Sequence, residues 1–110
     1  MKPLDEILRM GDPSGYLYKY AYKNGRLESK WEGLLLLLGN PRQLFYYTIY
    51  IIEDRWFEAE EHIKKDPRYA YHYAEYIIKK RWEEAEEYIK RDKRWWERYC
   101  NSFGVNCEIT

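Results

Sequence analysis

The residues best suited to chemistry in this sequence are glutamates, which recur in two short acidic runs. The runs contain Glu58, Glu60 and Glu61, and later Glu84, Glu86 and Glu87. Paired carboxylates catalyse acid–base reactions or bind metal ions when they converge on one pocket and their pKa values are driven apart. Here both runs occupy the same places along a helical pattern and have Lys or Arg nearby, as ion-paired helix surfaces do. We therefore interpret these side chains as a solvated helix face.

The histidine, serine and glycine patterns form no catalytic or metal-binding motif. The two histidines, His62 and His72, stand outside the HExxH motif and outside zinc-ligand spacings. Ser14, Ser29 and Ser102 lack the GxSxG context of a serine hydrolase, and no glycine-rich phosphate loop is present. The sequence thus predicts a protein that is not an enzyme and that uses no cofactor and no metal ion.

The composition narrows the class of protein further. The 110 residues are 45% hydrophobic and 35% charged, enough for one domain with a modest core. Nineteen basic and 19 acidic residues give a formal net charge of zero, which argues against a general polyanion binder. The longest apolar run, residues 34–38, is far shorter than the roughly 20 residues that span a bilayer. Residues 1–3 lead into a mixed segment without the apolar core of a signal peptide, so we expect a cytoplasmic protein without a membrane partner.

A 26-residue unit occurs twice in succession. Residues 40–65 and 66–91 are identical at 14 of 26 aligned positions. These include the phrase RW-x-EAEE, in which x stands for a position that differs between the copies. A truncated third copy begins at Asp92, and a degenerate earlier copy begins at Asp12. Chance does not produce such similarity, so the chain contains an internal repeat.

Each unit is predicted to form two helices of roughly 9 to 13 residues. Asn40-Pro41 and Asp66-Pro67 combine an N-cap residue with proline at the first helical position. The first helix of the later unit carries one apolar stripe, made of Ala70, Tyr73, Ala74, Ile77 and Ile78. Its second helix carries the stripe Trp82, Ala85 and Ile89. These spacings are those of amphipathic helices, and we expect the tryptophans to fill the space between the helices of a unit.

One helix pair cannot bury both stripes, whereas stacked pairs can. We therefore predict an all-α fold, a short α-solenoid of stacked helix-turn-helix repeats with seven or eight helices. The predicted single domain, residues 1–110, comprises an N-terminal cap (1–11), a degenerate repeat (12–39), two repeats (40–65 and 66–91), a half repeat (92–103) and a tail (104–110).

Two cysteines, Cys100 and Cys107, are too few for a disulfide scaffold, which again favours the reducing cytoplasm. Cys100 falls on the place of Ala74 in the repeat, so we expect a small buried side chain. Six residues separate the two cysteines, and a disulfide forms if the tail folds back. The sequence leaves that alternative open.

The phrase YA-x-x-II-K-x-RW-x-EAE-x-x-I, residues 73–89, resembles short Tyr/Trp/Glu-rich helical repeats in uncharacterised proteins of large bacteriophages and giant viruses. The likeness is strong over residues 41–100 and weak before them. Copies in those proteins tend to carry glycine in the turn before Arg-Trp, where this chain has Asp54 or Lys80 and keeps glycine only at Gly25. The resemblance implies a helical repeat fold and a viral origin, and it implies no chemistry. It makes a host protein, such as an antiviral defence factor, the expected partner.

Thirteen tyrosines and five tryptophans predict a surface that binds a partner. Tyrosine provides a rigid, amphipathic contact area at low entropic cost. The predicted partner-binding residues are Tyr50, Tyr69, Tyr76, Tyr88, Arg81 and Trp95. The competing interpretation places the aromatic side chains between successive copies, where they would seal the stack. Our leading hypothesis is a non-enzymatic protein-binding helical-repeat module, encoded by a phage and directed against a host protein.

Two alternatives belong to other functional classes. Basic and aromatic residues between 90 and 98 predict nucleic-acid binding, because cations contact phosphates while rings stack on bases. Self-assembly into a homodimer is the other alternative. It assumes that the incomplete last copy leaves Trp96, Tyr99 and Phe103 uncovered, so that a second chain covers them by two-fold pairing.

Overall fold

The computed structural model describes residues 1–107 and contains eight α-helices and no strand over that range. The all-α class is therefore confirmed. The elements are α1 (Leu4–Leu8), α2 (Pro13–Asn24), α3 (Ser29–Leu38), α4 (Pro41–Tyr47), α5 (Phe57–Ile63), α6 (Pro67–Tyr73), α7 (Glu83–Ile89) and α8 (Lys93–Phe103). Two π-helical turns, η1 (Thr48–Ile52) and η2 (Ala74–Ile78), continue α4 and α6.

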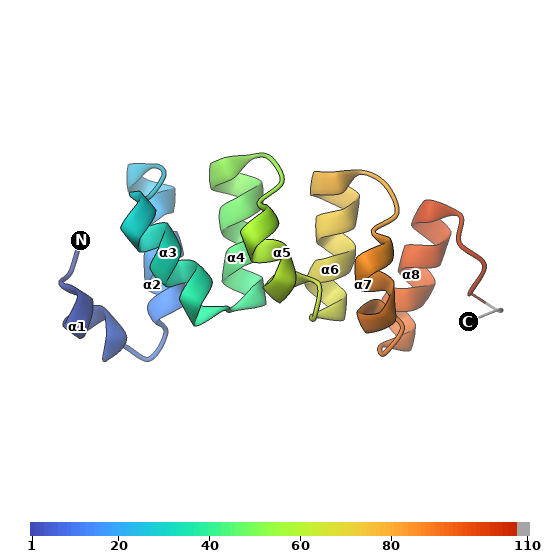
Figure 1. Ribbon diagram of the computed structural model, residues 1–110, viewed down its shortest axis with the longest axis horizontal. Helices are drawn as coiled ribbons and strands as arrows, with labels where there is room; N and C mark the ends of the chain where they lie inside the picture. Colours follow the sequence, from blue (N-terminus) through green and yellow to red (C-terminus); the bar gives the residue numbers. More distant parts are fainter. Residues whose placement is uncertain (108–110) are drawn as a thin grey trace.

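The helices follow one another along the long axis of a molecule measuring 50 × 24 × 19 Å (Figure 1). Helices α2, α4, α6 and α8 pack side by side in chain order, and we call them, with η1 and η2, the first row. Helices α3, α5 and α7 pack against them from one side and form the second row. The longest dimension therefore runs across the helices, and the main packing contacts of each described helix are with its neighbours in the two rows.

The first-row helices begin where the capping patterns predicted. The side chains of Asp12, Asn40, Asp66 and Asp92 each accept a backbone N–H from the first turn. Such a bond satisfies a donor that has no partner within the helix. The short opening helix α1 is also present. No helix among the described residues is long and apolar enough to cross a membrane.

Helix lengths differ from the prediction of 9 to 13 residues in the second row, where α5 and α7 have seven residues each. The first-row helices continue instead through a π-helical turn. The N–H of Glu53 donates to the carbonyl of Thr48 at 2.8 Å, and the N–H of Lys79 donates to Ala74 at 2.7 Å. Glu53 and Lys79 then adopt φ values of 62° and 64°, a left-handed conformation that reverses the chain at some cost for a non-glycine residue.

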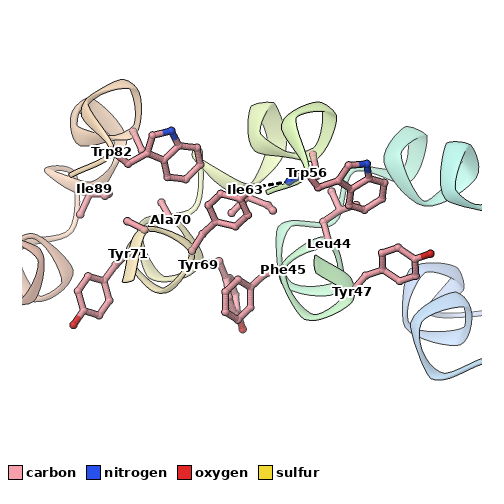
Figure 2. Packing of buried hydrophobic residues seen from close by; sticks show 14 of the residues in the cluster. Leu44, Phe45, Tyr47, Trp56, Ile63, Tyr69, Ala70, Tyr71, Trp82 and Ile89 are labelled. Carbon is pink, nitrogen blue, oxygen red and sulfur yellow. Dashed lines mark hydrogen bonds between the residues drawn. The ribbon is translucent and has the colours of Figure 1, made fainter. Parts of the chain in front are cut away.

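Tryptophans fill the space between the rows, as predicted. Trp56 and Trp82, the N-cap residues of α5 and α7, are 7% and 4% exposed. Their rings pack on Tyr47 and Tyr73, with ring centroids 5.3 and 4.9 Å apart. Figure 2 shows both indoles turned toward the first-row side chains from the second row. Their burial links each second-row helix to the first row.

The C-terminal end is closed by its own tail. Cys100 and Cys107 form a disulfide, which decides the question that the sequence left open. Val105 and Cys107 pack against the core. Of the three residues expected to be uncovered, Trp96 and Tyr99 are 6% and 0% exposed, and Phe103 is half-buried. The reason is that Trp96 and Tyr99 pack inward and the tail folds back across the end of the last helix.

Candidate binding face

A buried tyrosine joins each of α4, α6 and α8 to the unit before it. The Tyr73 hydroxyl donates to Glu60 at 2.6 Å and accepts the backbone N–H of Trp56 at 3.0 Å. Arg55 completes the group by donating two hydrogen bonds to Glu60, at 2.7 and 2.9 Å. We call such a set, a tyrosine with its glutamate, arginine and backbone donor, a tyrosine link.

The tyrosine link occurs three times at corresponding positions. In the next unit Tyr99 donates to Glu86 at 2.6 Å and accepts from the N–H of Trp82 at 2.8 Å. Arg81 donates to Glu86 at 2.8 and 2.9 Å. In the first unit the corresponding set is Tyr47, Glu32, Arg26 and the N–H of Leu27. Each link satisfies a backbone donor in the turn between rows and so fixes where the next helix packs.

The environment of the links shifts the pKa values of their tyrosines and of Glu86, so that at neutral pH the tyrosines are protonated and Glu86 is ionised. Burial, followed by the hydrogen bond to glutamate, raises the pKa values of Tyr47, Tyr73 and Tyr99 far above 10.0. Burial alone would raise the pKa of Glu86, but hydrogen bonds from Arg81 and Tyr99 outweigh it and hold the pKa below 4.5. Acid–base catalysis needs a group whose pKa lies near the working pH. The pKa values of these tyrosines and of Glu86 lie far from pH 7, so the links are suited to structural support.

Two of the predicted solvated glutamates are therefore misassigned. Glu60 and Glu86 are 7% and 8% exposed and belong to the links, and Arg81, predicted to bind a partner, is bound to Glu86. The remaining members of the two acidic runs, Glu58, Glu61, Glu84 and Glu87, are exposed as predicted. A signal was present: Glu60 stands at i+4 from Trp56 and so lies within the apolar stripe of its helix.

The first row presents a regular grid of side chains, which we call the aromatic face. It contains side chains that are spaced four residues apart, on the same side of each first-row helix. These are Tyr18 and Tyr22 on α2, Arg42, Tyr46 and Tyr50 on α4 and η1, Arg68, His72 and Tyr76 on α6 and η2, and Arg94 and Arg98 on α8. Because these positions recur at the unit spacing, similar side chains stand beside each other on successive helices.

Ring contacts make this face continuous. Tyr18 of α2 lies 5.7 Å from Tyr46 of α4, measured between ring centroids. Tyr46 lies 6.2 Å from Tyr69 of α6, which in turn packs on Phe45 (Figure 2). His72 stacks on Tyr76 at 5.9 Å, and burial lowers the pKa of His72, which favours the neutral ring. The face is thus one connected aromatic layer across three helices.

The arginines of this face lie over aromatic rings. The guanidinium of Arg42 is 5.7 Å from the ring of Tyr46, and that of Arg68 is 5.4 Å from Tyr69. Arg94 and Arg98 lie 5.3 and 4.8 Å from the ring of Trp95. Among residues 1–107 none of these four arginines forms an ion pair, whereas the arginines of the tyrosine links all do. All four arginines are exposed, and Arg42 also forms a side-chain hydrogen bond with Tyr46.

The two rows differ in charge. First-row helices carry seven basic residues, Lys19, Lys23, Arg42, Arg68, Lys93, Arg94 and Arg98, against two acidic residues, Glu75 and Glu97. Second-row helices carry one basic residue, Lys30, against eight acidic residues, Glu32, Glu58, Glu60, Glu61, Glu83, Glu84, Glu86 and Glu87. A net charge of zero therefore describes neither row, and it does not argue against an anionic ligand on the first.

The predicted partner-binding residues do not form one surface. Tyr50 and Tyr76 are 56% and 51% exposed and lie on the aromatic face, as does Tyr22 at 68%. Tyr69 and Trp95 are buried at contacts between first-row helices, beneath the arginines. Tyr88 is half-buried on α7 in the second row, with Arg91 over its ring. Sequence reasoning had missed Arg42 and Arg68, whose equal register was the available signal.

A second exposed surface lies at the N-terminal end. Leu4 and Leu8 of α1 are both 50% exposed, and Leu37 of α3 is 82% exposed. Leu4 and Leu37 line a shallow groove together with Trp31. This surface is mainly apolar, in contrast to the cationic aromatic face.

No group of three or more His, Cys, Asp or Glu side chains within residues 1–107 is arranged to hold a metal ion. Comparison of the chain with protein-family models, curated proteins and solved structures found no match. The function must therefore be inferred from the geometry of these surfaces.

Proposed function

We propose that the protein is a non-enzymatic binding module that engages a macromolecular partner through its aromatic face. The observation that carries this proposal is a face with exposed tyrosines at one end of its helices and, at the other end, arginines that have no carboxylate partner within residues 1–107. Exposed tyrosine and unpaired arginine are the side chains that most often dominate binding surfaces.

We further propose that the chain is a short α-solenoid. The recurrence of helix bounds, π-helical turns and tyrosine links at a 26-residue spacing supports this interpretation. In such a scaffold each unit contacts its neighbours, and an extended surface results from stacking. The aromatic face is that surface, since every unit adds the same positions to it.

On the basis of the resemblance to viral repeats, we place the partner in a bacterial host. A host protein, such as a defence factor, remains our hypothesis for a protein partner. The exposed aliphatic surface of Leu4, Leu8 and Leu37 favours a protein contact at the N-terminal end as a second candidate.

Affinity capture from bacterial lysate tests the proposal. Wild-type protein is compared with the double variant Tyr50→Ala/Tyr76→Ala and with Phe57→Ala, which removes an aromatic ring that is 64% exposed on the second row. We expect a stoichiometric partner with wild type and with Phe57→Ala, and its loss with the double variant. Equal capture by all three proteins would exclude the aromatic face.

If only the Leu37→Asp variant failed to capture the partner, the contact would be assigned to the N-terminal surface. Circular dichroism of each variant shows whether the helices are retained, so that unfolding is separated from loss of binding. Half of each lysate is treated with nuclease, which separates protein partners from those captured through nucleic acid.

A further inference from the structure

We propose that the ligand of the aromatic face is a single-stranded nucleic acid that lies along the first row, an inference that rests on the proposed function. Its phosphates would contact a row of arginines and its bases would stack on a row of tyrosines. The arginine row is Arg42, Arg68 and Arg94, one for each of α4, α6 and α8. The tyrosine row is Tyr22, Tyr50 and Tyr76, one for each of α2, η1 and η2.

The arginine row lies at the N-terminal ends of α4, α6 and α8, and the tyrosine row lies at the C-terminal ends of α2 and of η1 and η2, which continue α4 and α6, so two first-row helices carry both. Arg42 contacts Tyr46, and Tyr46 contacts Tyr50 at a centroid distance of 6.4 Å, so one column runs from the arginine row to the tyrosine row. In the next column Arg68 lies 6.0 Å from the ring of Trp95, which contacts His72, and His72 stacks on Tyr76. A ligand bound along the face thus meets cations along one edge and exposed rings along the other.

This arrangement matches a polymer with repeating chemistry. A single strand carries a phosphate on one edge and a base on the other in every nucleotide, so the two units that hold both an arginine and a tyrosine of these rows can make the same pair of contacts. A protein segment repeats its backbone but not its side chains, so it matches a row of identical arginines and tyrosines less well. The equal register of both rows therefore favours a nucleic acid over a peptide.

Charge supports the same ligand. The guanidinium planes of Arg42, Arg68 and Arg94 lie over rings, and no carboxylate among the described residues pairs with them. The capping carboxylates Asp66 and Asp92 stand near the same helix ends, but each accepts two backbone N–H groups there. The acidic second row repels a polyanion, so the strand is confined to the aromatic face.

The exposed rings explain why a single strand is favoured over a duplex. Tyr22, Tyr50 and Tyr76 are 68%, 56% and 51% exposed, and stacking on them needs bases that are free of a complementary strand. The contacts proposed here are to phosphates and to the faces of bases, which every nucleotide has. Binding is therefore expected to tolerate any base sequence.

Fluorescence anisotropy with fluorescein-labelled dodecamers of dT and rU, and with a duplex dodecamer, tests the proposal. We expect the wild type to prefer both single strands to the duplex. Affinity for the single strands should fall roughly 20- to 50-fold between 50 and 200 mM salt if three or four phosphates are contacted. Unlabelled poly-L-glutamate serves as a competitor that carries charge without bases.

Matched variants locate the strand. Tyr50→Ala should weaken binding of dT about fivefold or more, while Phe57→Ala on the second row should leave it unchanged. Arg68→Glu should weaken it roughly tenfold, while Lys30→Glu, the same charge change on α3, should have little effect. Retention of helical circular dichroism in each variant excludes unfolding as the cause.

The inference would be overturned if neither single strand bound at 50 mM salt, or if the duplex bound with equal affinity. It would also be overturned if Arg68→Glu and Lys30→Glu lowered the affinity for dT equally. The same holds if poly-L-glutamate displaced the labelled strand as effectively as unlabelled dT does. The proposed function fails separately. A nuclease-resistant protein captured by wild type, and lost with Tyr50→Ala/Tyr76→Ala, would retain the aromatic face as a binding surface while assigning it to a protein.

Discussion

The hydroxyl of Tyr73 donates a 2.6 Å hydrogen bond to Glu60, a residue 13 positions earlier in the chain and in the other row of helices. The same hydroxyl accepts the N–H of Trp56, so one atom connects a helix of one unit to a turn and a helix of the unit before it. Tyr99 and Glu86 repeat this relationship. A polar bond inside an otherwise apolar contact fixes the register of packing, because only one placement satisfies all its partners.

Removing that hydroxyl should destabilise the protein. Tyr73→Phe leaves the buried N–H of Trp56 without its acceptor and Glu60 without one donor, which should lower the free energy of unfolding by about 1–3 kcal/mol. Chemical denaturation followed by circular dichroism measures the change. Tyr76→Phe removes the same hydroxyl from an exposed ring and should cost less than about 0.5 kcal/mol. Equal effects of the two changes would show that the tyrosine link does not stabilise the fold.

Neighbouring aromatic residues at the start of α5 should differ in their contribution to stability. Trp56 is 7% exposed and Phe57 is 64% exposed. Trp56→Ala should therefore cost about 3–5 kcal/mol through lost packing and the cavity left behind. Phe57→Ala should cost less than about 1 kcal/mol. The midpoints of thermal unfolding of the two variants compare them directly, and a more stable Trp56→Ala protein would contradict the packing described.

High pH should unfold the protein by ionising the tyrosine links. The folded-state pKa values of Tyr47, Tyr73 and Tyr99 lie above the ordinary value of 10.0. Their contribution to stability is therefore complete below pH 10 and is lost as the pH rises further. Tyrosinate absorbance should show exposed tyrosines ionising first and these three ionising only together with loss of the helical signal. Full ionisation of all tyrosines while the helices remain would refute this.

Low pH should weaken the last link. The folded-state pKa of Glu86 is held below 4.5, so its contribution to stability is present above that pH and is lost as the pH falls below it. Glu86→Gln should reduce the dependence of unfolding free energy on pH between neutrality and acid. The matched change Glu87→Gln, at an exposed position, should leave that dependence as in the wild type. Denaturation at a series of pH values decides between them.

Reduction of the disulfide should loosen the C-terminal end. Cys100 and Cys107 are seven positions apart, and closing so short a loop should contribute about 2 kcal/mol. A reducing agent should lower the unfolding midpoint of the wild type and should have no effect on Cys107→Ser. If the reducing agent leaves the wild type unchanged, the tail is held by its apolar contacts alone.

The helices were predictable because their signals are local. An N-cap followed by proline, as at Asp66-Pro67, acts within one turn, and the spacing of Ala70 and Tyr73 follows from helical geometry alone. The π-helical turns were missed because they depend on how the chain reverses before Trp56 and Trp82. The second-row helices α5 and α7 are shorter than predicted because they begin only after these chain reversals.

The functional surfaces were predicted only in part, because side-chain partners depend on stacking. Tyr50 and Tyr76, predicted to bind a partner, are exposed, whereas Arg81, predicted with them, is half-exposed and paired with Glu86. In the sequence alone, a glutamate four residues after a tryptophan looks like a solvated acid. Its burial becomes evident only in the structure, where a tyrosine of the next unit donates a hydrogen bond to it. Conversely, Arg42 and Arg68 become notable only when the stacked helices place them in equal register, with Arg68 of α6 lying 6.0 Å from the ring of Trp95 on α8.

The unequal distribution of charge between the rows has a consequence for the molecule as a whole. With basic side chains prevailing on the helices of the first row and acidic side chains on those of the second, the helical charge is unevenly distributed despite a formal charge of zero. In a uniform field such a molecule turns without migrating. Near a charged surface or a charged polymer it arrives with one side already facing the target, so encounters begin in a productive orientation.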